Sequence, residues 1–318
     1  MSKTIVFKAN KEESKITIQK FLCGKFDTLS LEDVASIITS GSLKVNGVVQ
    51  NGAYGINEGD DIEVTLNDFL CEKSEDECSF GNIESIKKLI VYEDENILIA
   101  NKPASLLVQR NIAFGPSLES YIRDYLAKND PSSKASAAHR LDRGTSGLVI
   151  FGKNKESLSA LGVAFMNRDE IKKTYTALAL GKTPAEGIIS VPLGKDKTTG
   201  NVSPCPVDKG GKPCVTRYTT TERYKDYSLL QVNIETGRNH QIRAHLLSIG
   251  HPIAGDPRYG EKDDNEKLKK RFGLSSQFLH AGSLSFISLH SPLDYLNGKT
   301  FTAPLPLVEE KMLKELEQ

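Results

Sequence analysis

The sequence predicts an α+β protein in which a mixed, mostly antiparallel central sheet forms the larger domain and a small unit of helices and a hairpin precedes it. From residue 86 onward, strand-like and helix-like segments lack the strict alternation that a doubly wound parallel sheet requires. Residues 14–67 show two helical patterns, a hairpin and a final strand. A chain of 318 residues is long enough for about two domains.

The small unit is predicted from apolar spacing and turn residues. Two sets of apolar residues recur at helical spacing: Ile16, Ile18, Phe21 and Leu22, then Leu31, Val34, Ile37 and Ile38. Gly41 follows the second set, where a glycine ends a helix. Asn46-Gly47 marks a hairpin turn within residues 43–49, and a last strand at residues 62–64 follows Gly59-Asp60.

This order of elements resembles the small alpha-L RNA-binding domain of the ribosomal-protein-S-four kind, through its Val-Asn-Gly and Gly-Asp pieces. Three positions depart from that family. Thr17 and Leu31-Glu32 stand where arginine and Ser-Arg usually open the two helices, and Gly41-Ser42-Leu43 replaces a basic start of the strand. Residues 14–67 carry four lysines against seven acidic residues. Because phosphate contacts need cations, we expect this domain to contribute little RNA affinity.

The rest of the chain is predicted to be an acidic linker at residues 68–85 and a larger domain at residues 86–318. Residues 90–92 and 97–100 flank an acidic turn and predict a hairpin, and residues 148–151 predict a buried strand. Further strands are expected at residues 174–180 and 227–234. Helices are expected at residues 117–126, from the cap Asn154 to about residue 166, and at residues 240–249 before Gly250.

Charge is distributed unevenly although the net charge is zero. Residues 1–85 carry eight lysines, no arginine and fifteen acidic residues, a net charge of −7, so the remainder carries +7. The first arginine is Arg110. A polyanion is therefore attracted to the second part of the chain and repelled by the first.

Composition also bounds location and cofactors. Short apolar runs and an N-terminus without the apolar stretch of a signal peptide favour a cytoplasmic protein that does not enter a membrane. Five scattered cysteines suit reduced thiols. Cys71/Cys78 and Cys205/Cys214 are too widely spaced for a usual zinc knuckle, so no metal site is predicted.

Residues 139–148, His-Arg-Leu-Asp-Arg-Gly-Thr-Ser-Gly-Leu, form the most informative motif. Asp142 lies between Arg140 and Arg143 and ahead of a glycine-bearing turn that enters the buried strand. Arginines beside a carboxylate favour its charged form. Such an aspartate is a nucleophile, a general base or one half of an ion pair, and for Asp142 alone the ion pair is the commoner case.

Further segments extend this motif. Lys172-Lys173-Thr174-Tyr175 places a tyrosine in a strand behind two lysines, and residues 236–245 form a glycine-bearing turn that enters a basic helix, which favours anion binding. The remaining segments are Asn101-Lys102-Pro103-Ala104-Ser105, His251-Pro252-Ile253-Ala254-Gly255-Asp256, Tyr259-Gly260, Leu279-His280-Ala281 and Ala303-Pro304-Leu305-Pro306.

Together these segments resemble the RluA-type family of pseudouridine synthases, over about residues 90–307. The resemblance implies the pseudouridine synthase fold with a catalytic cleft, and a cofactor-free isomerase. Such an enzyme cleaves the N1–C1′ bond of a uridine in RNA, turns the base and rejoins it through C5. The target base must leave its stack to be reached, so basic residues would hold the backbone while the base enters a pocket.

The resemblance also implies residue roles. Asp142 aligns with the nucleophile, with attack at C1′ or at C6 left open, and Arg243 with the arginine that pairs with it. Tyr175 aligns with the aromatic residue that stacks on the base and assists proton removal from C5. Arg140 aligns with the residue that fills the gap left by the flipped base. The residues expected to contact RNA or line the pocket are Arg140, Arg143, Lys172, Lys173, Arg238 and His240.

Other interpretations of these residues are weaker. His240 and His245 are five residues apart, not the four of a helical zinc pair, so they are interpreted as structural or phosphate-contacting. Ser146 lacks the Gly-x-Ser-x-Gly elbow of a hydrolase. Asp256 is expected to cap a turn. Ser105 stands where the family usually has glycine after Lys-Pro-Ala.

We therefore expect an RNA pseudouridine synthase that acts as a monomer on large-subunit ribosomal RNA. Two alternatives stay open: a transfer RNA substrate, because appended surfaces rather than the pocket choose the RNA, and a non-catalytic RNA-binding factor for ribosome assembly. Asp142, Tyr175 and Arg243 together favour the enzyme.

Overall fold

The computed structural model describes residues 3–11, 13–25, 34, 37–66, 83–109, 117–128, 130, 133–167, 169–196 and 201–317. The chain divides into two compact units. The first comprises residues 1–86 and 109–121, and the second residues 87–108 and 122–318. Most of the predicted linker, residues 67–82, lies outside the described residues.

The first unit contains a sheet of four strands in the order β1 (Lys3–Lys8), β4 (Asp61–Leu66), β2 (Leu43–Val45), β3 (Val48–Val49). Its helix α1 (Ile18–Lys25) buries Ile18, Phe21 and Leu22 against the sheet, in agreement with their helical spacing. The predicted hairpin is confirmed. Asn46 and Gly47 both have positive φ, +49° and +79°, as a two-residue turn of this type requires.

Two features of this unit differ from the sequence pattern or extend it. The first strand, β1, precedes the predicted range 14–67 and pairs antiparallel with β4 along its whole length. Of the second predicted helix, Val34 and residues 37–39 are helical, and the other residues from 26 to 36 lie outside the described part. Gly41 has φ +73°, which confirms it as the end of that helix.

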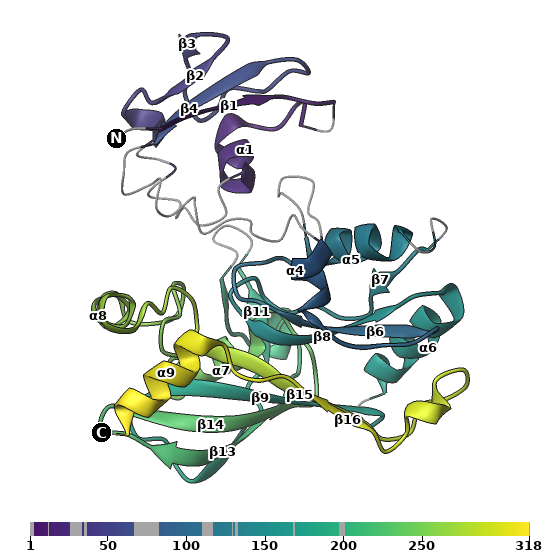
Figure 1. The fold of residues 1–318 in the computed structure, drawn as a ribbon. Coiled ribbons are helices and arrows are strands. Elements are labelled where there is room, and N and C mark those ends of the chain that lie inside the picture. Colours follow the sequence, from purple (N-terminus) through teal and green to yellow (C-terminus); the bar gives the residue numbers. More distant parts are fainter. Residues whose placement is uncertain are drawn as a thin grey trace. The chain divides into compact units, whose positions relative to one another are not determined.

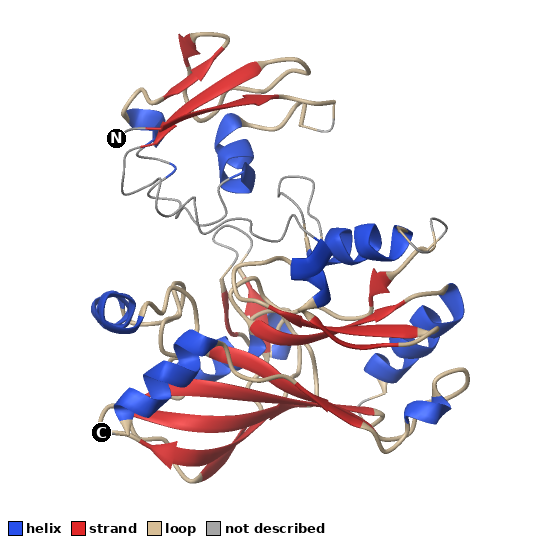
Figure 2. Ribbon diagram, viewed as in Figure 1, coloured by secondary structure: helices blue, strands red, loops and turns tan. Residues whose placement is uncertain are grey.

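The second unit is built on one mixed sheet (Figures 1 and 2). Its main order is β10-β13-β14-β9-β15-β8-β6-β5, with β16 paired to β15 and β7 paired to β8. All pairs are antiparallel except β15 with β8. The predicted α+β class with a mixed, mostly antiparallel sheet is therefore confirmed.

The strands of this sheet are β5 (Ile90–Glu93), β6 (Ile97–Lys102), β7 (Ser136–Ala137), β8 (Ser146–Gly152), β9 (Ile171–Leu180), β10 (Glu186–Ile189), β13 (Thr216–Arg223), β14 (Tyr227–Ile234), β15 (Leu279–Phe286) and β16 (Thr300–Thr302). A separate ribbon pairs β11 (Leu193–Lys195) with β12 (Val202–Pro204). The helices after residue 82 are α4 (Ile83–Lys87), α5 (Leu118–Ala127), α6 (Lys155–Met166), α7 (Gln241–Ser248), α8 (Lys262–Phe272) and α9 (Leu307–Leu316). Short 3-10 turns cover Val207–Lys209 and Asp294–Leu296.

The predicted elements of the larger domain correspond closely to this arrangement. Every residue of β8 is buried, which explains its continuous apolar run. Asn154 accepts a hydrogen bond from the Ser157 amide (2.8 Å) and caps α6 as expected. Strand β14 covers the predicted range, and Gly250 follows α7 with φ +79°. No helix among the described residues is long and apolar enough to span a membrane.

Candidate active site

Asp142 and Arg243 meet although 101 residues separate them in the sequence. Asp142 lies in the turn that enters β8, and Arg243 lies in the first turn of α7. Arg243 Nη1 donates to Asp142 Oδ2 at 3.0 Å. The arginine side chain is 6% exposed and the aspartate side chain 24% exposed. The carboxylate is therefore held from the protein side and open on another side.

Asp256 holds the other edge of the same guanidinium. Arg243 Nε and Nη2 donate to Asp256 Oδ2 and Oδ1 at 2.7 and 2.8 Å, a two-point pair, and Asp256 is fully buried. Burial opposes the charge of Arg243, but Asp256 and then Asp142 raise its pKa above the usual value. Asp256 Oδ1 also accepts from the amides of Arg258 and Tyr259, so the predicted turn cap is confirmed. Its ion pair with Arg243 was not predicted.

Glycines let the 139–148 motif approach its neighbours closely. A Cβ on Gly147, which has φ +111°, would lie 2.3 Å from the Ala281 carbonyl oxygen of β15. A Cβ on Gly144 would lie 2.3 Å from the Gln277 side chain. At Gly147 the clash would be with backbone atoms, so only glycine fits there and the Asp142 turn can lie close against β15, whereas a side chain at Gly144 would require the Gln277 side chain to move.

Tyr175 and Lys173 share one face of β9, because side chains alternate along a strand. Tyr175 is 5% exposed, and burial, then Asp142, raises its pKa, so the phenol stays protonated at neutral pH. Lys173 Nζ lies 5.1 Å from the ring centroid of Phe165, and burial lowers its pKa to about 8. The charge of Asp142 thus opposes ionisation of the Tyr175 phenol.

Lys102 connects its own loop to the turn that carries Asp142, a role that was not predicted from the sequence. It is fully buried, and Nζ donates to the carbonyls of Pro103, Leu106 and Arg143 at 2.8, 2.8 and 2.9 Å. Burial lowers its pKa to about 7, while three carbonyls match the three hydrogens of the charged form. The Asn-Lys-Pro motif was a visible signal, but it did not reveal which backbone groups the amine would reach.

His240 adjoins this ion-pair network at the start of α7. It has φ +50°, and its Nδ1 lies 2.8 Å from the Tyr259 hydroxyl. Burial lowers the pKa of His240, whereas Asp142 opposes that shift. Tyr259 also places its ring 5.0 Å from the Arg243 guanidinium carbon.

The other predicted RNA contacts fall into two groups. Arg140 and Arg238 are exposed, and Arg143 is half-buried, with Nε donating to the Ser105 carbonyl at 3.1 Å. Ser105 itself has φ +70°, a backbone conformation that glycine adopts more readily than serine.

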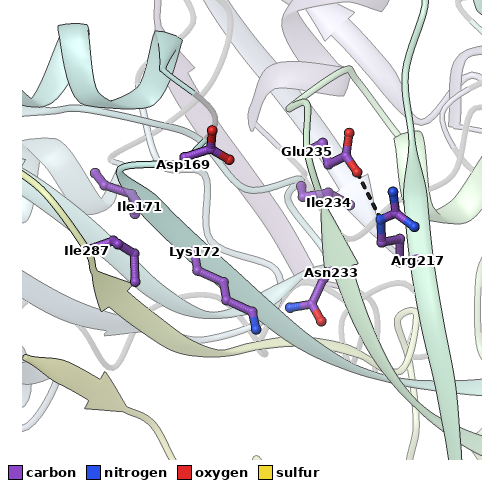
Figure 3. Close-up of a pocket in the computed structure, with 8 residues that line it drawn as sticks. All are labelled: Asp169, Ile171, Lys172, Arg217, Asn233, Ile234, Glu235 and Ile287. Atoms are coloured by element: carbon purple, nitrogen blue, oxygen red, sulfur yellow. Dashed lines mark hydrogen bonds and ion pairs between the residues drawn. The ribbon is translucent and has the colours of Figure 1, made fainter. Parts of the chain in front are cut away.

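Lys172 is not brought to the Asp142 side of β9. Its side chain points to the opposite face from Lys173 and Tyr175 and lines a separate pocket (Figure 3). The residues that line this pocket are Asp169, Ile171, Lys172, Arg217, Asn233, Ile234, Glu235 and Ile287. Arg217 and Glu235 form an ion pair there, at 2.9 Å.

The histidine and serine alternatives lead to structural contacts. Ser146 Oγ lies 2.9 Å from His280 Nδ1, but both residues are only 1% exposed, so the pair is closed to a substrate. His245 is fully buried, with Nδ1 2.8 Å from Thr216 Oγ1 and Nε2 2.8 Å from the Val191 carbonyl. Within the described ranges, no group of three or more His, Cys, Asp or Glu residues could hold a metal ion.

Comparisons with known proteins agree with this geometry. Residues 96–248 match the family described as RNA pseudouridylate synthase. The chain is 31% identical over 315 residues to the uncharacterized RNA pseudouridine synthase YlyB of Bacillus subtilis (strain 168), covering 97% of this chain and 96% of the relative. It is 31% identical over 280 residues to ribosomal large subunit pseudouridine synthase C of Buchnera aphidicola subsp. Acyrthosiphon pisum (strain APS), covering 87% and 88%.

A solved structure shows the same fold. Human RNA Pseudouridylate Synthase Domain Containing 4 matches with a TM-score of 0.60 and 21% identity, covering 74% of this chain and 95% of that one. The sequence relatives carry the assignment further, because they align along nearly the whole length of both chains. The protein belongs to the RluA-type family of RNA pseudouridine synthases and is an isomerase.

Proposed function

We propose that this enzyme converts specific uridines of large-subunit ribosomal RNA into pseudouridine, with Asp142 as the nucleophile. The observation that carries the proposal is the chain of contacts from Asp256 through Arg243 to Asp142. Because two nitrogens of Arg243 are bound to Asp256, the third is fixed in direction and aims one oxygen of Asp142. The other oxygen stays available for the substrate.

The reaction needs no external group. The Asp142 carboxylate attacks the uridine at C1′ or C6 and forms a bond there, and the N1–C1′ bond breaks. The base then turns, the C5–C1′ bond forms and the bond to Asp142 breaks. C5 loses a proton and N1 gains one, so the product is an isomer of the substrate. The buried, protonated Tyr175 offers an aromatic ring for the base to stack on and a hydroxyl that can donate. Since Tyr175 is not ionised, Asp142 is the better candidate to accept the C5 proton.

Exposed and partly buried basic side chains supply the means of holding RNA. Arg140 enters the space of the flipped base, while Arg143, Lys173, Arg238 and His240 contact backbone or pocket atoms. Lys172 would bind RNA only if the RNA chain reaches the face of β9 opposite Lys173 and Tyr175. We propose further that the enzyme works as a monomer in the cytoplasm, where thiols such as Cys205 and Cys214 stay reduced.

The ribosomal target is proposed from the relatives. The Buchnera relative is named as a ribosomal large subunit pseudouridine synthase. Residues 14–67, 68–85 and 86–318 would then act as an RNA-binding-type domain, an acidic linker and the catalytic domain. The first of these would choose among RNAs by shape more than by charge, because it carries few cations.

Tritium release tests the proposal. RNA labelled with tritium at uridine C5 should lose label with the wild type and not with Asp142→Asn, while that variant still binds RNA. Asp263→Asn, an exposed aspartate of α8, is the matched control and should release label normally.

Unmodified large-subunit transcripts and transfer RNA transcripts should be compared as substrates. Release from transfer RNA alone would identify transfer RNA, not ribosomal RNA, as the substrate. No release from either RNA would favour a non-catalytic RNA-binding factor. Equal release by wild type and Asp142→Asn would overturn the nucleophile assignment.

A further inference from the structure

Tyr259 contacts both the ion-pair network and the ribbon β11–β12. Its ring packs against Arg243, and its edge faces the His240 ring at a centroid distance of 5.6 Å. Its hydroxyl accepts a hydrogen bond from the Val202 amide of β12 at 2.9 Å and lies 2.8 Å from His240 Nδ1. Tyr259 is 8% exposed, so water competes little for these contacts.

The hydroxyl settles which nitrogen of His240 carries the proton. The Val202 amide donates to the Tyr259 oxygen, and among the described residues His240 is the only other hydrogen-bond partner of that hydroxyl. If His240 donated as well, the buried hydroxyl hydrogen would have no acceptor. The favourable arrangement has Tyr259 donating to Nδ1, so that His240 is neutral and carries its hydrogen on Nε2. The lowered pKa of His240 agrees with a neutral ring.

The charged and titratable groups that act on His240 come from three places. They are Asp142 in the turn before β8, Arg243 in α7, and Asp256, Arg258 and Tyr259 in the turn after α7. Both carboxylates are already bound to Arg243. The tyrosine hydroxyl is therefore the group in direct contact with the ring that sets its tautomer.

The ring of Tyr259 limits the movement of Arg243. The guanidinium is fixed at its edge by Asp256 and Asp142, and the tyrosine ring covers its face. Asp256 also accepts from the Tyr259 amide at 3.0 Å, so both restraints come from the same short turn. A Cβ on Gly260 would lie 2.6 Å from the Asp256 carbonyl oxygen, which shows how tightly that turn is closed.

The hydroxyl also anchors the ribbon. Val202 packs in a small core with Leu193, Cys214 and Ala244, the last of these in α7. Its amide donates to the Tyr259 hydroxyl at 2.9 Å. The position of β12 on α7 thus depends on the same hydroxyl that orients His240.

We propose that Tyr259 is a positioning residue of the isomerase: its hydroxyl keeps His240 in the Nε2–H form and seats β12, and its ring holds Arg243 against Asp142. This inference rests on the proposed function for its effect on catalysis. Its effect on His240 does not depend on which RNA is modified.

Two substitutions separate the role of the Tyr259 hydroxyl from the role of its ring. Tyr259→Phe keeps the ring and removes the hydroxyl, and should lower the single-turnover rate about 10-fold, the loss of one buried hydrogen bond. Tyr259→Leu removes the ring as well and should lower it about 100-fold. Tyr227→Phe is the matched control, because it removes a buried tyrosine hydroxyl bonded to Asp264 outside the site, and should leave the rate unchanged.

Nitrogen NMR of histidine-labelled protein provides a readout besides activity, with the His240 signal assigned from its loss in His240→Gln. The wild type should show a neutral ring protonated at Nε2 across pH 6–8. In Tyr259→Phe, the ring should take up the other tautomer or become protonated within that range, and the pH profile of the rate should shift. His240→Gln combined with Tyr259→Phe should lose little more activity than either change alone.

An unchanged His240 spectrum and pH profile in Tyr259→Phe would overturn the proposal, and so would an equal rate loss in Tyr227→Phe. If Tyr259→Leu unfolds, its melting temperature will show this, and the phenylalanine variant still decides. If the wild type isomerises no RNA, the proposed function fails, and the NMR result still decides whether Tyr259 sets the His240 tautomer.

Discussion

Arg243 makes hydrogen bonds through three nitrogen atoms while the face of its guanidinium packs on the Tyr259 ring, and few residues can replace it. Lysine carries the same charge but offers a single nitrogen and no planar group. The geometry therefore depends on the shape of the guanidinium as much as on its charge. An aspartate that alone most often forms a structural salt bridge becomes, with this partner, a carboxylate with a fixed direction and one free oxygen.

Arg243→Lys should lower kcat/KM at least about 100-fold, because the two-point contact with Asp256 and the aimed contact with Asp142 cannot both be kept. Tritium release under single-turnover conditions measures the effect. Arg217→Lys, in an exposed pair with Glu235 on the other face of the sheet, should change the rate less than 2-fold. Comparable losses in the two variants would show that arginine geometry is not the reason.

The buried carboxyl group of Glu309 should make the stability of the folded protein depend on pH. It is buried in the first turn of α9, one carboxyl oxygen has no partner among the described residues, and burial raises its pKa to about 8. The unfolded chain releases this proton near pH 4.5, so the folded state loses stability relative to the unfolded state as pH rises from about 4.5 to about 8.

Glu309→Gln removes that loss. The variant should therefore melt at a higher temperature than the wild type at pH 8, and the two should differ little well below pH 4.5, where both the folded and the unfolded wild type hold the proton. The free-energy gap should widen by at most about 1.4 kcal/mol per pH unit. Differential scanning calorimetry at several pH values measures it, and a gap that is independent of pH would contradict the assignment.

At the scale of single elements, features that depend on neighbouring residues were predicted from the sequence, whereas contacts between distant segments were harder to predict. The Asn46-Gly47 turn, the Asn154 cap and the buried strand β8 each depend on residues a few positions apart, so the sequence displays them directly. Strand β1 was not predicted, because its partner β4 lies more than 50 residues away. The pairing of Arg243 with Asp142 came from family resemblance, and spacing alone could not place them together.

The turn that follows β6 offers a test of backbone strain. Ser105 has φ +70°, a conformation that costs a residue with a side chain about 1–2 kcal/mol. Ser105→Gly should raise the free energy of unfolding by about 0.5–1 kcal/mol, since part of the gain is offset by the greater freedom of glycine in the unfolded chain. Thermal melting should show an increase of about 1–3 °C. Ser105→Ala, which keeps the strain, should show no increase, and a gain equal to that of glycine would rule out strain as the cause.

On the scale of the whole molecule, charge is distributed unevenly along the chain. Residues 1–85 carry a net charge of −7, and every arginine lies later in the chain. RNA affinity that comes from phosphate contacts depends on salt, with a slope of about 0.7–0.9 in log–log form for each phosphate neutralised. The salt dependence of RNA binding therefore reports which part of the chain supplies the cations that contact phosphates.

Removal of residues 1–80 should lower RNA affinity less than about 10-fold and leave the salt slope nearly unchanged, because few cations are lost. Arg143→Glu combined with Arg238→Glu should instead reduce the slope by roughly two contacts, about 1.4–1.8. Binding to a fixed large-subunit RNA fragment, measured by fluorescence anisotropy between 50 and ~300 mM salt, compares the two changes. If the truncation reduced the salt slope more than the double substitution did, the lysines of residues 1–80 would supply phosphate contacts. The prediction that most phosphate contacts come from the later, basic part of the chain would then be wrong.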